Sequence, residues 1–155
     1  MAIPRKLLCC FCFIFGTMFT HHTKNKGDLG VLKAKLDLFE QGFLILNPET
    51  EHAPFDLVIY RDGIFKRVQV KYRKLNSRKA LEVSFRSSHS YSKGVVNKAV
   101  NKSEIDIYAI YCPDTEKCYY IAPGEFNKTV VLRVNPPQNL QSAGIHSAED
   151  YRKVP

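Results

Sequence analysis

The sequence lacks several features that mark common protein classes. It contains one Cys-x-x-Cys spacing, Cys9 to Cys12, and no second such pair to complete four ligands, so a structural zinc site has little support. It has no internal repeat and no low-complexity tract, so its 155 residues predict a single domain. The apolar run at residues 7–19 is shorter than the ~20 residues that a membrane-spanning helix needs. We therefore expect no membrane partner.

The apolar run follows Arg5 and Lys6, and this order matches a signal peptide. The alternative is a start assigned too far upstream, with Met18 as the true first residue. The run lacks a good small-residue cleavage site, which favours the second interpretation and a cytoplasmic protein. We expect residues 1–20 to lie outside the fold and residues 21–155 to form one domain.

Few cysteines lie outside the N-terminal run. Cys112 and Cys118 flank a predicted hairpin and are spaced so that they could bridge its two strands. The alternative is a pair of reduced thiols in an intracellular protein, and this is the favoured interpretation.

Acidic residues are scarce in one stretch. Residues 65–102 contain eleven Lys or Arg and one acid, Glu82, whereas the rest of the chain holds 12 basic and 14 acidic residues. The excess positive charge behind the net charge of +8 is therefore concentrated in residues 65–102. A basic stretch of this kind fits nucleic acid, an anionic membrane or an acidic partner.

The order of predicted elements indicates the fold class. A helix over residues 23–41 opens the domain, and residues 105–111 form a strongly apolar strand that we expect at the centre of the sheet. Residues 87–103 are expected to be a long loop with one helical turn, and residues 123–127 a single helical turn. The remaining strands are predicted at residues 43–46, 53–60, 65–74, 81–86, 118–122 and 129–134. This order predicts an α/β (α+β) domain with a mixed central β-sheet and an N-terminal helix.

The opening helix carries an acid in line with large apolar residues. Leu32, Leu36 and Phe39 recur at helical spacing, which predicts that they face the core, and Asp28 begins the same stripe. Asp28 is either a first-turn contact with the helix dipole or an acid directed inward at a site.

The hairpin is the centre of the predicted site. Asp62-Gly63 favours a two-residue type I′ turn, and this turn fixes the register so that paired residue numbers sum to 125. Asp56 then lies opposite Gln69, with Lys71 on the same face. Val68, Val70 and Tyr72 point toward a core. The trio is either a solvated sheet face or a catalytic cluster.

These residue types suit metal-dependent phosphodiester hydrolysis. Mg²⁺ prefers oxygen ligands, which Asp56, the amide of Gln69 and the backbone carbonyl of Val70 can supply. Asp28 can join them as a ligand or a water-positioning group. Lys71 can orient the nucleophile or stabilise the developing charge.

The motifs resemble the PD-(D/E)XK nuclease superfamily, and within it the group I intron-encoded homing endonucleases of the tRNA-intron type. The resemblance is carried by Lys26-Gly-Asp28-Leu-Gly30, Ala53-Pro-Phe-Asp-Leu57 and Val68-Gln-Val-Lys-Tyr72, and covers about residue 21 to the end. Gln69 departs from the family, which usually has Asp or Glu there.

The resemblance implies a restriction-endonuclease-like core and a Mg²⁺-dependent enzyme, with Mn²⁺ a substitute. It implies cleavage of both strands of double-stranded DNA at a long pseudo-palindromic site by a homo-oligomer, a tetramer in this branch and a dimer otherwise. Asp56 carries over as metal ligand, Gln69 as the neutral replacement for the second acid, and Lys71 as the catalytic lysine. The loss of one negative charge at Gln69 predicts weaker metal binding.

The basic stretch is the expected DNA-binding surface. We expect a two-stranded ribbon, from about residue 73 to residue 86, to enter a major groove. The alternative is a solvated basic loop. The candidate contacts are Arg73, Lys74, Arg78, Lys79, Ser84, Arg86, Ser88, His89, Tyr91, Lys93, Lys98 and Lys102.

Two other functions stay open. One is a different PD-(D/E)XK enzyme, such as a restriction enzyme or junction resolvase, which the substrate would distinguish. The other is a DNA-binding protein of the same fold that has lost cleavage activity. The neutral Gln69, where the family usually has an acid, keeps this alternative open.

Overall fold

We describe the protein from a computed structural model, which covers residues 23–50, 52–91, 94–99, 102–136 and 144–155. The backbone of residues 86–91, 94–99 and 102 is described without side chains. Residues 1–20, Lys93 and the three N-terminal cysteines lie outside the described residues.

A mixed five-stranded sheet forms the centre of the molecule. Its order is β1-β2-β3-β7-β8, in which β3 and β7 are parallel and the other neighbours are antiparallel. The central strand β7 is buried along its whole length, as the apolar sequence predicted. The strands are β1 (Leu44–Leu46), β2 (Leu57–Arg61), β3 (Ile64–Tyr72), β7 (Ile107–Cys112) and β8 (Lys117–Ile121).

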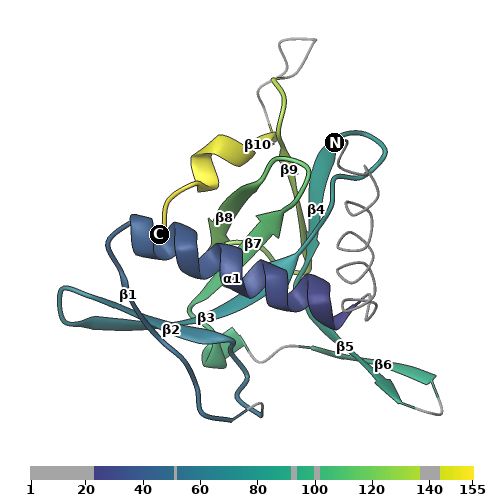
Figure 1. Cartoon of the computed structure of the whole chain (residues 1–155). Coiled ribbons are helices and arrows are strands. Elements are labelled where there is room, and N and C mark those ends of the chain that lie inside the picture. The colour runs from purple at the N-terminus through teal and green to yellow at the C-terminus, as the bar shows by residue number, and fades with distance from the viewer. Residues whose placement is uncertain (1–22, 51, 92–93, 100–101, 137–143) are drawn as a thin grey trace, which may run out of the picture.

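Two further layers cover this sheet. Helix α1 (Lys24–Glu40) crosses one face, and a smaller sheet of order β10-β9-β4 packs on the other (Figure 1). The strands of the smaller sheet are β4 (Ala80–Ser84), β9 (Thr129–Arg133) and β10 (His146–Ser147). A short helical turn, η2 (Ala148–Tyr151), follows β10 and contacts β8. The mixed α+β architecture is therefore confirmed.

Each of the two spaces between layers has its own hydrophobic core. Tyr108, Ile110 and Cys112 of β7 pack toward the smaller sheet, whereas Ile107, Ala109 and Tyr111 pack toward α1. Successive side chains of a strand point to opposite faces, so β7 supplies both cores.

The cysteines flanking the β7–β8 hairpin are free and buried. Cys118 pairs in register with Tyr111 rather than with Cys112, and the two thiols lie in different cores on opposite faces of the sheet. A disulfide across this hairpin is therefore excluded by the register, and the reduced interpretation is confirmed.

The predicted face of the opening helix is wrong. The helix buries Gly30, Ala34 and Leu38, whereas Leu32 is 63% and Leu36 is 55% exposed. Two of the three buried residues, Gly30 and Ala34, are small because α1 lies close to β3: a Cβ on Gly30 would stand 3.5 Å from the Cβ of Tyr72. Both stripes have helical spacing, so spacing alone could not choose between them.

The basic stretch also folds differently from the prediction. β4 pairs with β9 rather than forming a ribbon with residues 73–79, which are a loop. The predicted long loop instead contains the hairpin β5 (Arg86–Tyr91) and β6 (Gly94–Ala99), which projects from the body of the molecule (Figure 1). The turn η1 (Lys102–Glu104) follows it. Residues 123–127 form a hydrogen-bonded turn and no helix.

None of the helices in the described ranges is long and apolar enough to cross a membrane.

Candidate active site

The hairpin has the register that its turn predicts. Arg61 pairs with Ile64 and Leu57 pairs with Val68, so every paired sum is 125. Asp62 and Gly63 have φ values of 53° and 83°, as a type I′ turn requires. The turn residues therefore fix the relative position of both strands.

Asp56 lies in a bend directly before β2. The ladder ends at Leu57, one residue short of the predicted Asp56–Gln69 pair. The Asp56 N–H donates to the Val68 carbonyl at 2.9 Å, and its Oδ2 accepts from the Val70 N–H at 2.6 Å. The carboxylate is thus held against the edge of β3 where β2 has ended.

The backbone of Val70 faces this edge. The N–H and carbonyl of a strand residue point to the same side of the strand, and the Val70 N–H points at Asp56. The Val70 carbonyl is therefore directed to the same side, beyond the end of β2. The Asp56 carboxylate and the Val70 carbonyl therefore lie on the same side of β3, where the β2 ladder has ended.

Gln69 and Lys71 project from the face of β3 opposite α1. Their register partners on β7 are Tyr108 and Ile110, which belong to the core beneath the smaller sheet. The Lys71 ammonium lies 5.5 Å from the centre of the Tyr108 ring, a cation–π distance. The prediction that Val68 faces a core on the other side is confirmed, and Val70 and Tyr72 pack against that core.

Gln69 carries an unpartnered oxygen. In the described part of the chain, its Oε1 and the hydroxyl of Tyr108 are the two buried side-chain oxygen or nitrogen atoms without a hydrogen-bond partner. A buried polar atom without a partner loses solvation free energy, so native structures supply a partner or a ligand. The Gln69 oxygen is therefore available to a bound cation.

The electrostatics couple Asp56 to Lys71. Loss of water contact raises the pKa of the Asp56 carboxyl, while the Val70 N–H and the Lys71 charge oppose this rise. Burial, with the charge of Arg73, lowers the pKa of Lys71 to about 8, against the attraction of Asp56. Each group therefore favours the charged form of the other, although no direct ion pair joins Asp56 to Lys71 among the described residues.

Asp28 shares a cleft with Asp56. The cleft has a volume of about 620 Å³, and Gln69 and Lys71 are not in its lining. Asp28 is the fifth residue of α1 and is exposed, so it is neither in the first turn nor in line with buried leucines. The lining residues are Lys24, Asp28, Lys35, Asn47, Pro48, Glu49, Thr50, Ala53, Phe55 and Asp56.

Sequence reasoning missed two residues of this region. Tyr108 lies inside an apolar strand, and only the parallel pairing of β3 with β7 reveals that it underlies Lys71. Glu49 brings a further acid to the Asp28–Asp56 cleft from a polar loop that carried no pattern. Both needed tertiary contacts.

The oxygen atoms at the end of β2 fit a hard divalent cation. Asp56 offers a carboxylate, Val70 a carbonyl and Gln69 a buried amide oxygen, which are the donor types that Mg²⁺ takes. Among the described residues, no three His, Cys, Asp or Glu side chains gather as a metal cluster. A cation here would depend on one carboxylate supplemented by neutral oxygens.

The predicted DNA contacts divide between two places. Arg73, Lys74, Arg78 and Lys79 belong to the loop before β4, and Ser84 ends β4. The backbone of Arg86, Ser88, His89, Tyr91 and Lys98 lies in the β5–β6 hairpin, and Lys102 begins η1. The predicted DNA contacts therefore form two separate basic regions, and the single ribbon of residues 73–86 that we expected is not present.

Comparisons with known proteins agree with the fold. No curated protein matched the chain. Among solved structures, a bacterial homing endonuclease, I-Ssp6803I, has the same fold with a TM-score of 0.70 and 21% sequence identity, covering 84% of this chain and 88% of that one. The family model for the PD-(D/E)XK endonuclease matches residues 21–154. Enzymes of this family generally use divalent metal ions. The chain belongs to the PD-(D/E)XK endonuclease family.

Proposed function

We propose that this nuclease is a Mg²⁺-dependent, site-specific endonuclease that cuts both strands of duplex DNA. The observation that carries the proposal is the edge of β3, where Asp56 accepts a hydrogen bond from the Val70 N–H and is attracted by the charge of Lys71. A carboxylate, two neutral oxygens and a cation are the groups that metal-assisted phosphodiester hydrolysis requires.

Asp56, the Gln69 amide oxygen and the Val70 carbonyl would hold the metal ion. When bound, the ion supplies Lewis acidity at the scissile phosphate. Lys71 contributes a positive charge beside Asp56, where it steadies the negative charge that develops on the phosphate. Asp28 lines the same cleft as Asp56 and can position water from the helix side.

The similarity to a bacterial homing endonuclease supports a long DNA target. The β5–β6 hairpin supports major-groove reading, because a two-stranded β-ribbon fits that groove. It follows β4 after Phe85, whose ring lies 4.8 Å from that of Tyr108 beneath Lys71. A ribbon rooted beside the cleavage cluster can set the distance between the bases read and the bond cut.

An exposed apolar face of α1 supports a homo-oligomer. Leu29, Leu32, Leu36 and Phe39 are 40–69% exposed and lie on the side of the helix away from its buried residues. Their spacing of three, four and three residues is that of a helix–helix seam. A second copy of this chain, offering the same seam, would cover it.

The family match over residues 21–154 supports a nuclease domain of residues 21–155. We place its activity in the cytoplasm, where a chromosomal DNA target would be found.

Cleavage of a plasmid carrying an intronless tRNA gene tests the proposal. Wild type with Mg²⁺ should give a linear product, whereas EDTA or Asp56→Asn should abolish it. Asp62→Asn, at the exposed turn of the same hairpin, is the matched control and should cut normally. Binding of the plasmid without any Mg²⁺-dependent cleavage would contradict the proposal.

That negative outcome defines the second candidate function, DNA binding without cleavage. It is favoured by the neutral Gln69 and by the single carboxylate at the end of β2. A different PD-(D/E)XK activity is distinguished by substrate: cutting of four-way junctions without sequence preference would identify a junction resolvase rather than a homing enzyme.

A further inference from the structure

A second basic surface lies away from the cleavage cluster. The end of β4 is near that cluster, because Phe85 directly after it contacts Tyr108. The loop of residues 73–79 instead precedes β4, and the five residues of β4 separate the two ends by about 16 Å. Figure 1 shows the loop and the β5–β6 hairpin at opposite ends of β4.

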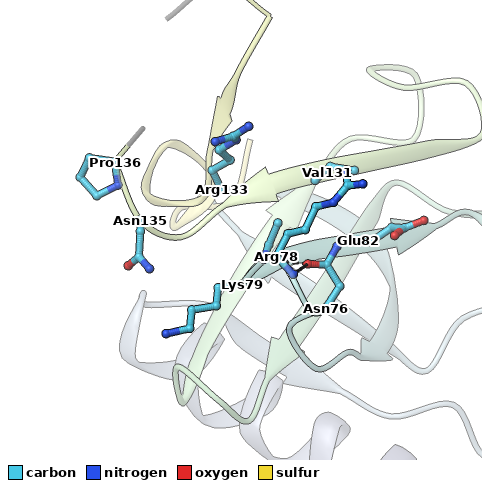
Figure 2. Close-up of a pocket in the computed structure, with 9 residues that line it drawn as sticks. Asn76, Arg78, Lys79, Glu82, Val131, Arg133, Asn135 and Pro136 are labelled. Atoms are coloured by element: carbon cyan, nitrogen blue, oxygen red, sulfur yellow. Dashed lines mark hydrogen bonds between the residues drawn. The ribbon is translucent and has the colours of Figure 1, made fainter. Parts of the chain in front are cut away.

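A cavity of about 720 Å³ opens at this far end. Its walls come from the loop before β4, from the outer face of the smaller sheet and from the chain after β9. Figure 2 shows Lys79 and Asn135 on one side of it and Arg78, Val131 and Glu82 on the other. The lining residues are Asn76, Arg78, Lys79, Ala80, Glu82, Val131, Arg133, Asn135 and Pro136.

The loop that presents Arg78 and Lys79 is held in one shape. The Asn76 side-chain oxygen accepts from the N–H of Arg78 at 3.0 Å and from that of Ala80 at 3.1 Å. The Asn76 carbonyl accepts from the Lys79 N–H at 2.9 Å, and Lys79 has a φ of 53°, in the left-handed region. The cations are therefore offered from a preformed turn, which lowers the entropy lost on binding.

The cationic side chains of this cavity differ in their partners from those that form ion pairs within the fold. Arg67 pairs with Asp106, Lys117 with Glu149 and Arg152 with Asp37. In the described part of the chain, no ion pair is formed by Arg78, Lys79 or Arg133, although Glu82 lines the same cavity. Three positive charges and two amides around one acid suit an anionic ligand.

We propose that this cavity binds backbone phosphates of DNA outside the segment held at the cleavage cluster. The inference rests on the proposed function for its ligand class, since the substrate is the polyanion this chain handles. Phosphates are contacted mainly by Arg, Lys and amide groups, which position the duplex without reading its sequence. The phosphates belong either to the flank of the duplex being cut or to a second duplex.

The test compares Arg78→Gln/Arg133→Gln with the matched control Lys33→Gln/Lys153→Gln, which removes the same charge from outside both basic surfaces. Both should keep the wild-type melting temperature. On a long random-sequence duplex, the first variant should reduce the slope of log affinity against log salt by about 2, because each phosphate contact contributes about 0.9. The control should leave this slope unchanged.

Two further measurements identify the source of the phosphates. A bead-bound duplex that captures a second, labelled duplex through wild type but not through the variant indicates a second duplex. Loss of long-duplex affinity without capture in either protein indicates the flank. A salt slope equal for the variant and wild type would overturn the proposal. Plasmid cleavage by wild type and by the Lys33→Gln/Lys153→Gln control keeps this outcome separate from a failure of the proposed function.

Discussion

The hairpin β2–β3 and the helix α1 both contribute residues to the candidate active site, yet they relate to the sequence in different ways. The hairpin has the register that Asp62-Gly63 predicts. The helix has the predicted length but presents the opposite face to the core. Both were inferred from short patterns, so the difference lies in the physics behind each pattern.

A turn limits its own backbone geometry, whereas an apolar stripe does not choose its partner. Type I′ dihedrals permit one pairing of the flanking strands, so two residues fix the neighbours of Asp56. The helix has two stripes, and its core side needed small residues for close approach to Tyr72. The large residues therefore lie on the exposed side of the helix.

The largest expected effect falls on the hairpin. Lys71→Met should reduce cleavage by about 10³-fold, the loss typical when one charge-stabilising group is removed. It should not reduce the free energy of unfolding, because burial makes the Lys71 charge costly in the folded state. Single-turnover cleavage and urea titration measure the two effects. Lys66→Met, on the same strand, should keep activity, and equal losses in both variants would contradict the assignment.

On the helix, a matched pair separates the two stripes. Leu38→Ala should lower the free energy of unfolding by about 3 kcal/mol, since it leaves a cavity in the core. Leu36→Ala should change it by less than about 0.5 kcal/mol in dilute monomer. Urea denaturation measures both free energies.

The double variant Leu32→Lys/Leu36→Lys should lower the molecular mass measured by sedimentation. An unchanged mass would show that the α1 seam is not the subunit contact.

A smaller effect is expected where the hairpin departs from its family. Gln69→Glu should lower the Mg²⁺ concentration for half-maximal cleavage by about tenfold, because metal affinity follows the charge of the ligands. Gln69→Leu, which removes the oxygen at similar size, should raise it. A titration of the cleavage rate with Mg²⁺ measures the midpoint for each protein. Identical midpoints for wild type and both variants would mean that Gln69 does not contact the metal.

The smallest effect is a dependence on pH. Lys71 has a pKa of about 8 in the fold and 10.5 ordinarily, so its charge is lost above pH 8. Cleavage should fall a few-fold from there, as the protonated fraction drops. Unfolding takes up a proton between these values, so the stability contributed by this group rises with pH across that window. Parallel rate and urea profiles, with Lys71→Met as control, measure both trends.

The sequence predicted the parts of the fold that local chemistry determines. The mixed sheet, the central strand and the hairpin register followed from apolar runs and turn residues. The β5–β6 hairpin was predicted as a loop because its residues alternate weakly, and the role of Tyr108 needed the parallel pairing of two strands far apart in sequence. Asp56 and Lys71 were placed together because one turn connects them; Glu49 was missed because a loop brings it to the cleft.

The early end of β2 has a consequence for how this activity could be altered. Inside a sheet, the backbone N–H and carbonyl groups of a strand normally hydrogen-bond to both neighbouring strands. Here β2 ends at Leu57, so the positions of β3 after Val68 have no paired β2 residue on that side. The candidate site thus lies where the β2–β3 ladder is interrupted, and the length of β2 determines its size. A variant in which β2 continued beyond Asp56 would pair the Val70 backbone with β2 and close the proposed metal position while keeping every predicted side chain.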